Sequence, residues 1–296
     1  MRQIPENQKF NTAAYNFAFL DEGSKREIRR KTLKAVAIPG YQVPFGSREL
    51  PIGRGWGTGG LQLTLSLIGR SDCVKVIDQG SDDSVNAVSI RRLIEETSHI
   101  STTENLTKAT IIQSRHRIPE DPMHAGQILV LQVPEPEPLR FVEPREEITK
   151  IQHGEMDYSG IWLTLYESIV KWGNITTGAD YPVMVNERYI MAPSPIPRWD
   201  NPKFNQANFL TLLGAGREKK IYAIPPYTDV ISLQFEDYPF TVESFLGLAC
   251  RHCHSEVSFM DEVVDSESGQ VIYQCSDTDY CNRRCNRSEG GIPDGR

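Results

Sequence analysis

Five of the six cysteines of this 296-residue chain lie in its last fifth, and this clustering constrains the fold more than any other feature. They stand as Cys250-x2-Cys253, Cys275-x5-Cys281 and, after three more residues, Cys285. The number of ligands separates the metals that such a cluster can hold. A structural zinc ion takes four thiolates, whereas an iron–sulfur cluster that also binds a substrate takes three and keeps one iron open. The sequence therefore predicts a small cysteine-rich metal-binding module near the C-terminus.

The simplest interpretation of this module is a zinc ribbon, which is a common structural unit. Zinc ribbons usually close with a second Cys-x2-Cys pair, and the wider Cys275-x5-Cys281 departs from that spacing. His252 and His254 are further candidate ligands, although solvated histidines are commoner at such positions. A disulfide framework fits least, because no signal peptide is visible in the sequence and clustered cysteines in the expected reducing cytoplasm more often bind metal or act in catalysis. The residues alone leave both zinc and an iron–sulfur cluster open.

Composition and charge exclude several classes of protein. The N-terminal MRQIPENQKF has no apolar stretch, and the longest apolar runs, such as 128–131, cannot span a bilayer. We therefore expect a cytoplasmic protein with no membrane association. The net charge of -7 argues against wholesale nucleic-acid binding. An anionic substrate would need a local basic patch that works against this field.

The hydrophobic patterns predict an α+β fold, with a mixed β-sheet core, flanking helices and the small C-terminal cysteine-rich module. The strict alternation in LQLTLSL, residues 61–67, is the clearest strand pattern. Ser84 is typical of a helix N-cap and predicts a helix to about residue 96. Further strands are expected at 73–77, 109–114 and 127–133, and the Pro/Glu-rich 133–147 predicts a linker or an extended surface segment.

These patterns divide the chain into four parts. We expect a flexible arm over 1–14, an α+β catalytic core over 15–246, the cysteine-rich metal or cluster module over 247–285, and a disordered tail over 286–296.

Three short stretches carry residue types that suit anion or radical chemistry. Arg115-His116-Arg117 ends a predicted strand and could grip a phosphate, but neighbouring strand residues face opposite sides unless the chain bends. A solvated basic strand edge is the alternative interpretation. Gly40 follows Pro39 as in an ordinary turn. The loop at 55–60 is dense in glycine, which suits either phosphate binding or a tight turn.

Long strings in this sequence extend the argument beyond single motifs. They are KAVAIPGYQVPFG, GWGTGG, KVIDQG, RHRIPE, QVPEPEPLRF, PSPIP, GAGREK, IYAIPP and CSDTDYC, in this order. With this set the chain resembles the radical S-adenosylmethionine subunits of carbon–phosphorus lyase over about residues 15–281. The resemblance implies an enzyme that cleaves α-D-ribose 1-methylphosphonate 5-phosphate to methane and a ribose 1,2-cyclic phosphate 5-phosphate.

The resemblance also implies the cofactors and the radical residues. Cys250, Cys253 and Cys275 would hold a [4Fe-4S] cluster whose open iron binds S-adenosyl-L-methionine. Gly40 would carry a glycyl radical and Cys281 a thiyl radical that attacks phosphorus. In protein prepared in air, zinc could occupy the same thiolates with Cys281 as its fourth ligand.

Substrate contacts and partners follow from the same resemblance. Arg115, His116, Gln132 and Tyr166 would bind the phosphate and ribose groups. The chain would work with other subunits of a carbon–phosphorus lyase core complex and with an electron donor. The alternative function is a structural or binding subunit of a phosphonate-metabolism complex, in which a zinc ribbon only stabilises the assembly.

Overall fold

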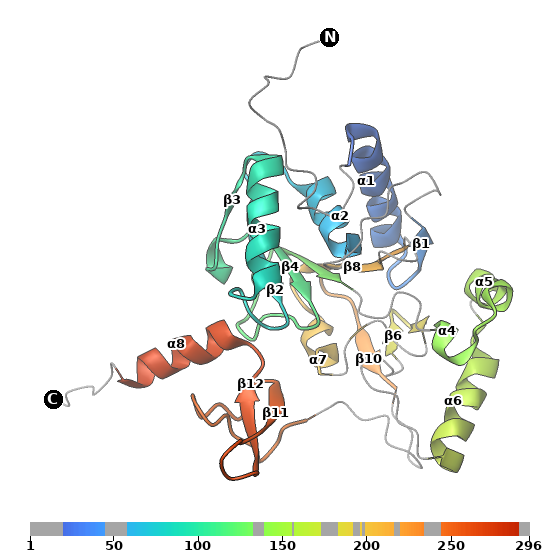
Figure 1. Ribbon diagram of the computed structural model, residues 1–296. Helices are drawn as coiled ribbons and strands as arrows, with labels where there is room; N and C mark the ends of the chain where they lie inside the picture. The colour runs from blue at the N-terminus through green and yellow to red at the C-terminus, as the bar shows by residue number, and fades with distance from the viewer. Residues whose placement is uncertain are drawn as a thin grey trace.

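A computed structural model describes residues 20–44, 58–132, 139–155, 157–172, 183–191, 196, 199–215, 220–233 and 244–289 (Figure 1). The helices are α1 (Glu22–Ala37), α2 (Thr58–Leu67), α3 (Val85–Ser98), α4 (Leu139–Val142), α5 (Glu146–Glu155), α6 (Ser159–Trp172), α7 (Asn201–Phe204) and α8 (Thr278–Glu289). The strands are β1 (Val43–Pro44), β2 (Cys73–Asp78), β3 (Ser101–Thr102), β4 (Ile111–Arg115), β5 (Ile128–Gln132), β6 (Val183–Val185), β7 (Arg188–Met191), β8 (Leu210–Ala215), β9 (Lys220–Ile224), β10 (Val230–Ser232), β11 (Met260–Val264) and β12 (Val271–Cys275).

A mixed sheet of seven strands forms the centre of the described structure, in the order β1-β9-β8-β5-β4-β2-β3. Strands β3, β2, β4, β5 and β8 run parallel, while β9 pairs antiparallel with β8 and β1 antiparallel with β9. The mixed sheet, its flanking helices and the C-terminal cysteine cluster confirm the predicted fold class. Because five strands are parallel, their carboxyl ends meet along one edge, where open α/β sheets usually bind ligands.

Both faces of the sheet are buried, so its central strands are mostly apolar. On one face, Val74 and Val130 pack with α1, α2 and α3, which Figure 1 shows together over the sheet. On the other face, Leu129 and Leu213 pack with Phe204 of α7 and with α6 and β6. This double burial explains why the strand patterns around 73–77, 109–114 and 127–133 were readable, and all three predicted strands are confirmed.

The predicted helix after Ser84 is also confirmed, and Ser84 caps it by accepting a hydrogen bond from the Ala87 backbone N–H at 3.1 Å. The predicted linker is wrong from residue 139 onward, because α4 and α5 begin there and Leu139 is fully buried. Residues 133–138 lie outside the described part of the chain.

The strand predicted at 61–67 is wrong, because these residues form helix α2. Alternation failed as a guide because the polar residues are buried as well: Thr64 and Ser66 are fully buried beside Leu63. The helix packs against α1 and against β4, β5 and β8, so little of its surface faces water. Ser66 satisfies its hydroxyl within the helix by donating to the Gln62 carbonyl at 2.7 Å. A helix buried on all sides loses the 3.6-residue polar pattern.

The cysteine module consists of the Cys250–Cys253 turn, the β11–β12 hairpin and α8, and it lies against the carboxyl end of β2 (Figure 1). The contact starts at a tight turn over 78–81, in which Gly80 has φ +78. The Gly80 carbonyl accepts a hydrogen bond from the Thr278 N–H at 3.1 Å. A Cβ atom on Gly80 would lie 1.9 Å from the Ser276 carbonyl oxygen. Glycine is required here both by the backbone conformation and by this close approach.

The structure describes part of the predicted C-terminal tail but none of the predicted N-terminal arm. Helix α8 continues through Glu289 and so includes the first residues of the segment predicted as a tail. Residues 1–14 and 290–296 lie outside the described part. Across the described ranges, none of the helices has both the length and the apolar character needed to cross a membrane.

The Gly80 contact predicts a large effect of one methyl group. We expect Gly80→Ala to destabilise the protein by about 4 kcal/mol, combining left-handed backbone strain with overpacking against Ser276. Gly269→Ala is the matched control, since Gly269 also has positive φ (+69) but has no neighbour within 4 Å of its Cβ position. The control should lose only about 1–2 kcal/mol. Urea unfolding of both variants checks this, and equal losses would contradict the docking contact.

Candidate functional site

Four buried cysteines converge in the C-terminal module. The Sγ atoms of Cys250, Cys253, Cys275 and Cys281 all lie within 4.8 Å of one another. The Cys250–Cys281 and Cys253–Cys275 sulfur pairs are 3.7 and 3.5 Å apart. Tetrahedral Zn–S bonds of about 2.3 Å place ligand sulfurs about 3.8 Å apart. The four thiols therefore fit a single tetrahedral ion as they stand.

The same donor set suits iron–sulfur ligation chemically, because cysteine thiolates are the usual ligands of such clusters. A four-iron cluster is larger than one ion, so three thiolates that hold it must stand further apart than these do. The described spacing thus matches the single-ion arrangement, with Cys281 as the fourth sulfur.

Each ligand is positioned by a short, well-bonded element. The Cys250–Cys253 turn is closed by hydrogen bonds from the Cys250 N–H to the Ser255 carbonyl and from the His254 N–H to the Cys250 carbonyl, at 2.9 and 3.0 Å. Cys275 ends β12. Cys281 lies in the first turn of α8, and its N–H donates to the Asp277 carbonyl at 3.0 Å.

The electrostatics of the cluster favour a bound cation. Burial raises the pKa of Cys250, but backbone N–H groups that donate to its sulfur, including those of His252 and Cys275, outweigh this and lower that pKa to about 6. Burial, together with the neighbouring thiols, raises the pKa of Cys281 to about 12 and raises that of Cys275 as well. A thiolate in this pocket therefore disfavours ionisation of the neighbouring thiols, and a bound metal cation would offset this repulsion.

The other candidate ligands do not join the cluster. His252 and His254 are exposed, and the group of converging ligand atoms contains cysteines only. Cys285 is half-buried one turn beyond Cys281 and packs against the cysteine cluster, but its sulfur is not among the four.

The carboxyl edge of the sheet brings two of the predicted substrate residues side by side. The register pairs Asp78 with Arg115, Arg115 with Gln132 and Gln132 with Gly214 on adjacent strands. The Arg115 guanidinium grips the buried Asp78 carboxylate in a bidentate pair, of which the Nη2–Oδ2 bond is 2.8 Å. Gln132 Oε1 accepts a hydrogen bond from the Gly60 N–H at 2.5 Å. The end of the glycine-rich loop therefore meets this edge.

The bend that Arg115 and His116 need in order to share a ligand is present. His116 has φ +77, a left-handed conformation that turns the chain directly after β4. Burial, and next the adjacent Arg115 charge, lower the pKa of His116, which favours a neutral imidazole. Arg117 stacks over the Phe259 ring, with 3.4 Å from its guanidinium carbon to the ring centroid. Since Arg115 is paired and Arg117 is stacked, this segment is not a solvated basic edge.

Gly40 and Tyr166 are not brought to the cysteine cluster in what the structure describes. Gly40 is buried with φ +75, and its N–H donates to the Ala223 carbonyl of β9 at 3.1 Å. Strands β8, β5 and β4 lie between β9 and β2, where the module is anchored. Four strand spacings correspond to roughly 19 Å. Tyr166 lies in α6, and its side chain is outside the described part.

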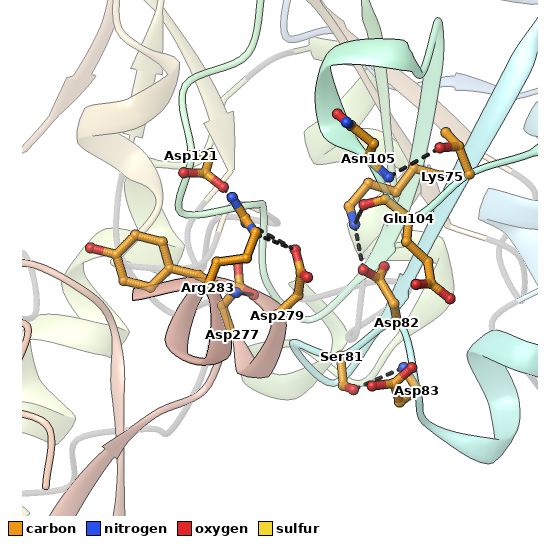
Figure 2. A network of polar contacts seen from close by, with 12 residues as sticks. Lys75, Ser81, Asp82, Asp83, Glu104, Asn105, Asp121, Asp277, Asp279 and Arg283 are labelled. Carbon is orange, nitrogen blue, oxygen red and sulfur yellow. Dashed lines mark hydrogen bonds and ion pairs between the residues drawn. The ribbon is translucent and has the colours of Figure 1, made fainter. Parts of the chain in front are cut away.

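Several residues that position the site were not identified from the sequence. Asp78 carried a usable signal, because it is a charged residue at the carboxyl end of a predicted strand. Lys75 and Asp82 form a buried ion pair at 2.5 Å, and Lys75 also donates to the Glu104 carbonyl at 2.6 Å. Burial raises the pKa of Asp82 to about 6 against the influence of Lys75. Figure 2 shows this pair beside the start of α8.

Arg283 of α8 links the module to the loop after β4. Its guanidinium pairs with Asp121 of that loop and, at 2.9 Å, with Asp279 of its own helix (Figure 2). Asp277 accepts a hydrogen bond from the Tyr280 N–H at 2.9 Å and so caps the first turn of α8. No sequence pattern signalled the Arg283–Asp121 pairing, because the two residues are 162 positions apart in the chain.

Comparison with known proteins extends these observations. The family described as "Phosphonate metabolism protein PhnJ" matches residues 13–287. The chain is 56% identical over 274 residues to "Alpha-D-ribose 1-methylphosphonate 5-phosphate C-P lyase" of Escherichia coli (strain K12), covering 93% of this chain and 97% of that protein. It is 55% identical over 272 residues to "Alpha-D-ribose 1-methylphosphonate 5-phosphate C-P-lyase" of Rhizobium meliloti (strain 1021), covering 92% and 91%.

The sulfur geometry predicts the zinc stoichiometry of protein purified in air. We expect one zinc per chain in the unmodified protein and at least a tenfold loss of zinc affinity in Cys253→Ala or Cys281→Ala, because each leaves only three thiolates. Cys285→Ala is the matched control and should keep the full zinc content. Elemental analysis after dialysis against a weak chelator checks this; full retention in Cys281→Ala would show that Cys281 is not a ligand.

A buried carboxylate next to the module predicts a pH dependence of stability. Asp200 has no exposed surface, and burial raises its pKa to about 6, against nearby Lys203 and Arg117. The folded state then holds a proton that the unfolded state releases, so its contribution is present below about pH 4 and is lost as pH rises through 6. Between pH 4 and 7, the free energy of unfolding should fall by on the order of 2 kcal/mol less in Asp200→Asn than in the unmodified protein. Denaturant unfolding across this range checks it, and parallel profiles would contradict it.

Proposed function

The chain is a carbon–phosphorus lyase of the PhnJ family of phosphonate metabolism proteins, and from that premise we propose that it is a radical S-adenosylmethionine enzyme. Its substrate is a ribose 1-alkylphosphonate 5-phosphate, and its products are an alkane (methane from the methyl compound) and ribose 1,2-cyclic phosphate 5-phosphate. The observation that carries the proposal is the 55% and 56% sequence identity with the two named lyases, which extends over more than 90% of the chain. The four converging thiols also support it, because their module is docked at the sheet edge where Arg115 and His116 could bind a phosphate group.

A radical route suits this bond. The carbon–phosphorus bond has no oxygen leaving group, so heterolysis would expel a carbanion, whereas homolysis lets carbon leave as a radical. Cys250, Cys253 and Cys275 would hold a [4Fe-4S] cluster, which with S-adenosylmethionine and one electron from a donor would supply a 5'-deoxyadenosyl radical. The protein supplies orientation and exclusion of water.

The residues of the chain then pass the radical to the substrate. Gly40 gives up a hydrogen atom from its Cα, and the glycyl radical takes one from the Cys281 thiol, which leaves a thiyl radical. The sulfur forms a bond to phosphorus while the carbon–phosphorus bond breaks and releases an alkyl radical. The alkyl radical takes a hydrogen atom from Gly40, which forms the alkane and restores the glycyl radical. Ribose O2' then attacks phosphorus, the sulfur–phosphorus bond breaks, and the O2' proton returns to Cys281.

The binding residues have roles that suit their chemistry. Arg115 uses two of its donor nitrogens on Asp78, and its other N–H groups are available to hold a phosphate oxygen. A neutral His116 donates one hydrogen bond to the same group. Gln132, and Tyr166 from α6, bind the ribose hydroxyls. Other subunits of a core complex and an electron donor complete the enzyme.

One observation favours a second function. The four sulfurs stand at the spacing of a single zinc ion, which supports a structural or binding subunit with a zinc ribbon. The two functions differ in what the module holds without oxygen. Reconstitution with iron, sulfide, the companion subunits and a reductant should yield about four irons per chain and release alkane from the substrate. Alkane release from iron-free protein would overturn the radical proposal, and retention of one zinc with no activity would favour the structural subunit.

The thiyl role of Cys281 predicts a separation of two products. We expect Cys281→Ala, reconstituted with iron, to cleave S-adenosylmethionine to 5'-deoxyadenosine but to release alkane at least 100-fold more slowly. Gas chromatography and liquid chromatography of the same reaction measure both products. Undiminished alkane release would remove Cys281 from this role, and Cys285→Ala should release alkane normally.

The role of Gly40 needs a test without mutation. Alanine at Gly40 would be strained by about 1–2 kcal/mol at φ +75, so a loss of activity in Gly40→Ala would not separate the radical role from a structural effect. Protein made with α-deuterated glycine leaves the structure unchanged. We expect deuterium to appear in 5'-deoxyadenosine, as detected by mass spectrometry. Absence of deuterium from 5'-deoxyadenosine would exclude glycine from the relay.

A further inference from the structure

Glu120 joins the loop that follows β4 to the cysteine module. It lies five residues after Arg115, and its side chain is 7% exposed. Its Oε1 accepts a hydrogen bond from the Phe259 N–H at 3.1 Å, and its own N–H donates to Asp277 Oδ2 at 3.1 Å. The second carboxylate oxygen pairs with Lys203 at 3.1 Å. Glu120 therefore binds the module at two places, the backbone of Phe259 and the side chain of Asp277.

These two positions flank the metal ligands. Phe259 directly precedes β11, and its carbonyl accepts a hydrogen bond from the Ser276 N–H, next to Cys275, at 3.1 Å. Asp277 receives the Cys281 N–H on its backbone carbonyl. A displacement of Glu120 would therefore shift the segments on both sides of the sulfur cluster, next to Cys275 and next to Cys281. The same loop also contributes Arg117, which stacks on the Phe259 ring.

The loop has two ends with different tasks. Arg115 and His116 stand at its start, on the carboxyl edge of the sheet, and Glu120 and Asp121 stand at its end, against the module. Lys203 holds the Glu120 carboxylate from the core side and also lies 3.5 Å from Asp200. Charge-assisted hydrogen bonds of this kind are stronger than neutral ones and fix orientation.

We propose that Glu120 is a positioning residue that sets the cysteine module over the sheet edge, in register with the Arg115–His116 segment. It touches neither substrate nor metal. Its loss should leave the thiol cluster assembled but should misplace the reactive sulfur relative to bound phosphonate. Misplacements on the order of 1 Å lower the rates of chemical steps by about a hundredfold. The role in turnover rests on the proposed function, whereas the role in docking does not.

The test compares Glu120→Ala with Glu256→Ala, an exposed glutamate of the same module, in the full-length chain. Zinc content per chain should be equal in both variants and in the unmodified protein. Hydrogen exchange followed by mass spectrometry should be at least tenfold faster in Glu120→Ala for the peptide that covers 256–262, because the Phe259 N–H loses its acceptor. The backbone N–H of residue 120 still reaches Asp277, so the peptide that covers 275–281 should change less. In Glu256→Ala the exchange of both peptides should be unchanged. Unchanged exchange in Glu120→Ala would overturn the docking role.

Turnover provides the readout that a merely structural role would not change. With iron, companion subunits and reductant, Glu120→Ala should form 5'-deoxyadenosine normally but release at least tenfold less alkane per deoxyadenosine. An unchanged ratio would overturn the positioning role. If Glu120→Ala fails to fold, Glu120→Gln replaces it as the test, because glutamine keeps an acceptor for the Phe259 N–H and loses only the ion pair with Lys203. We then expect a ratio of alkane to 5'-deoxyadenosine between those of the unmodified protein and a variant without the contact. A ratio equal to that of the unmodified protein would overturn the proposal. Absence of alkane from the unmodified protein would reject the proposed function, while exchange would still decide the docking role.

Discussion

The arrangement of this protein depends on the contact between the carboxyl end of the parallel sheet and the cysteine module. The contact combines backbone and side-chain groups: the Gly80 carbonyl receives the Thr278 N–H, the Glu120 carboxylate receives the Phe259 N–H, and Arg283 pairs with Asp121. The thiol cluster is therefore held at the edge where parallel sheets usually bind ligands. Without this contact, the phosphate-binding candidates and the thiols would be two unrelated features.

Burial gives this edge its chemical character. Asp78 is almost inaccessible, and it fixes the Arg115 guanidinium in one orientation through two hydrogen bonds. Buried thiols of raised pKa stand nearby and favour a cation. The same region thus offers fixed positive donors for an anion and a thiol pocket for a metal. An enzyme that must hold a phosphorylated substrate beside a reactive sulfur needs both.

The sequence predicted the parts of this structure that depend on local pattern. The strands that are buried on both faces were found, as was the helix capped by Ser84, because their signals lie within a few residues. Helix α2 was mistaken for a strand because its polar residues are buried against α1 and the sheet, which only tertiary structure determines. The clustering of the cysteines predicted a metal-binding module, but their spacing left open whether Cys281 is a fourth ligand. The Glu120 and Arg283 contacts could not be predicted, since they join residues far apart in the chain.

The separation of Gly40 from the thiols has a consequence for the radical relay. Gly40 lies buried in the turn between α1 and β1, and its N–H is bonded to β9, so moving it would disturb the packing of α1 and β1 on β9. The module is attached by polar contacts at Gly80, Glu120 and Asp121 and by the packing of Trp199 on Phe245 and Phe259. Hydrogen bonds contribute about 1 kcal/mol each in net terms, so releasing the module costs far less than disturbing the packing of α1 and β1 on β9. Movement of the module is therefore the less costly way to bring Gly40 and Cys281 together in the proposed relay.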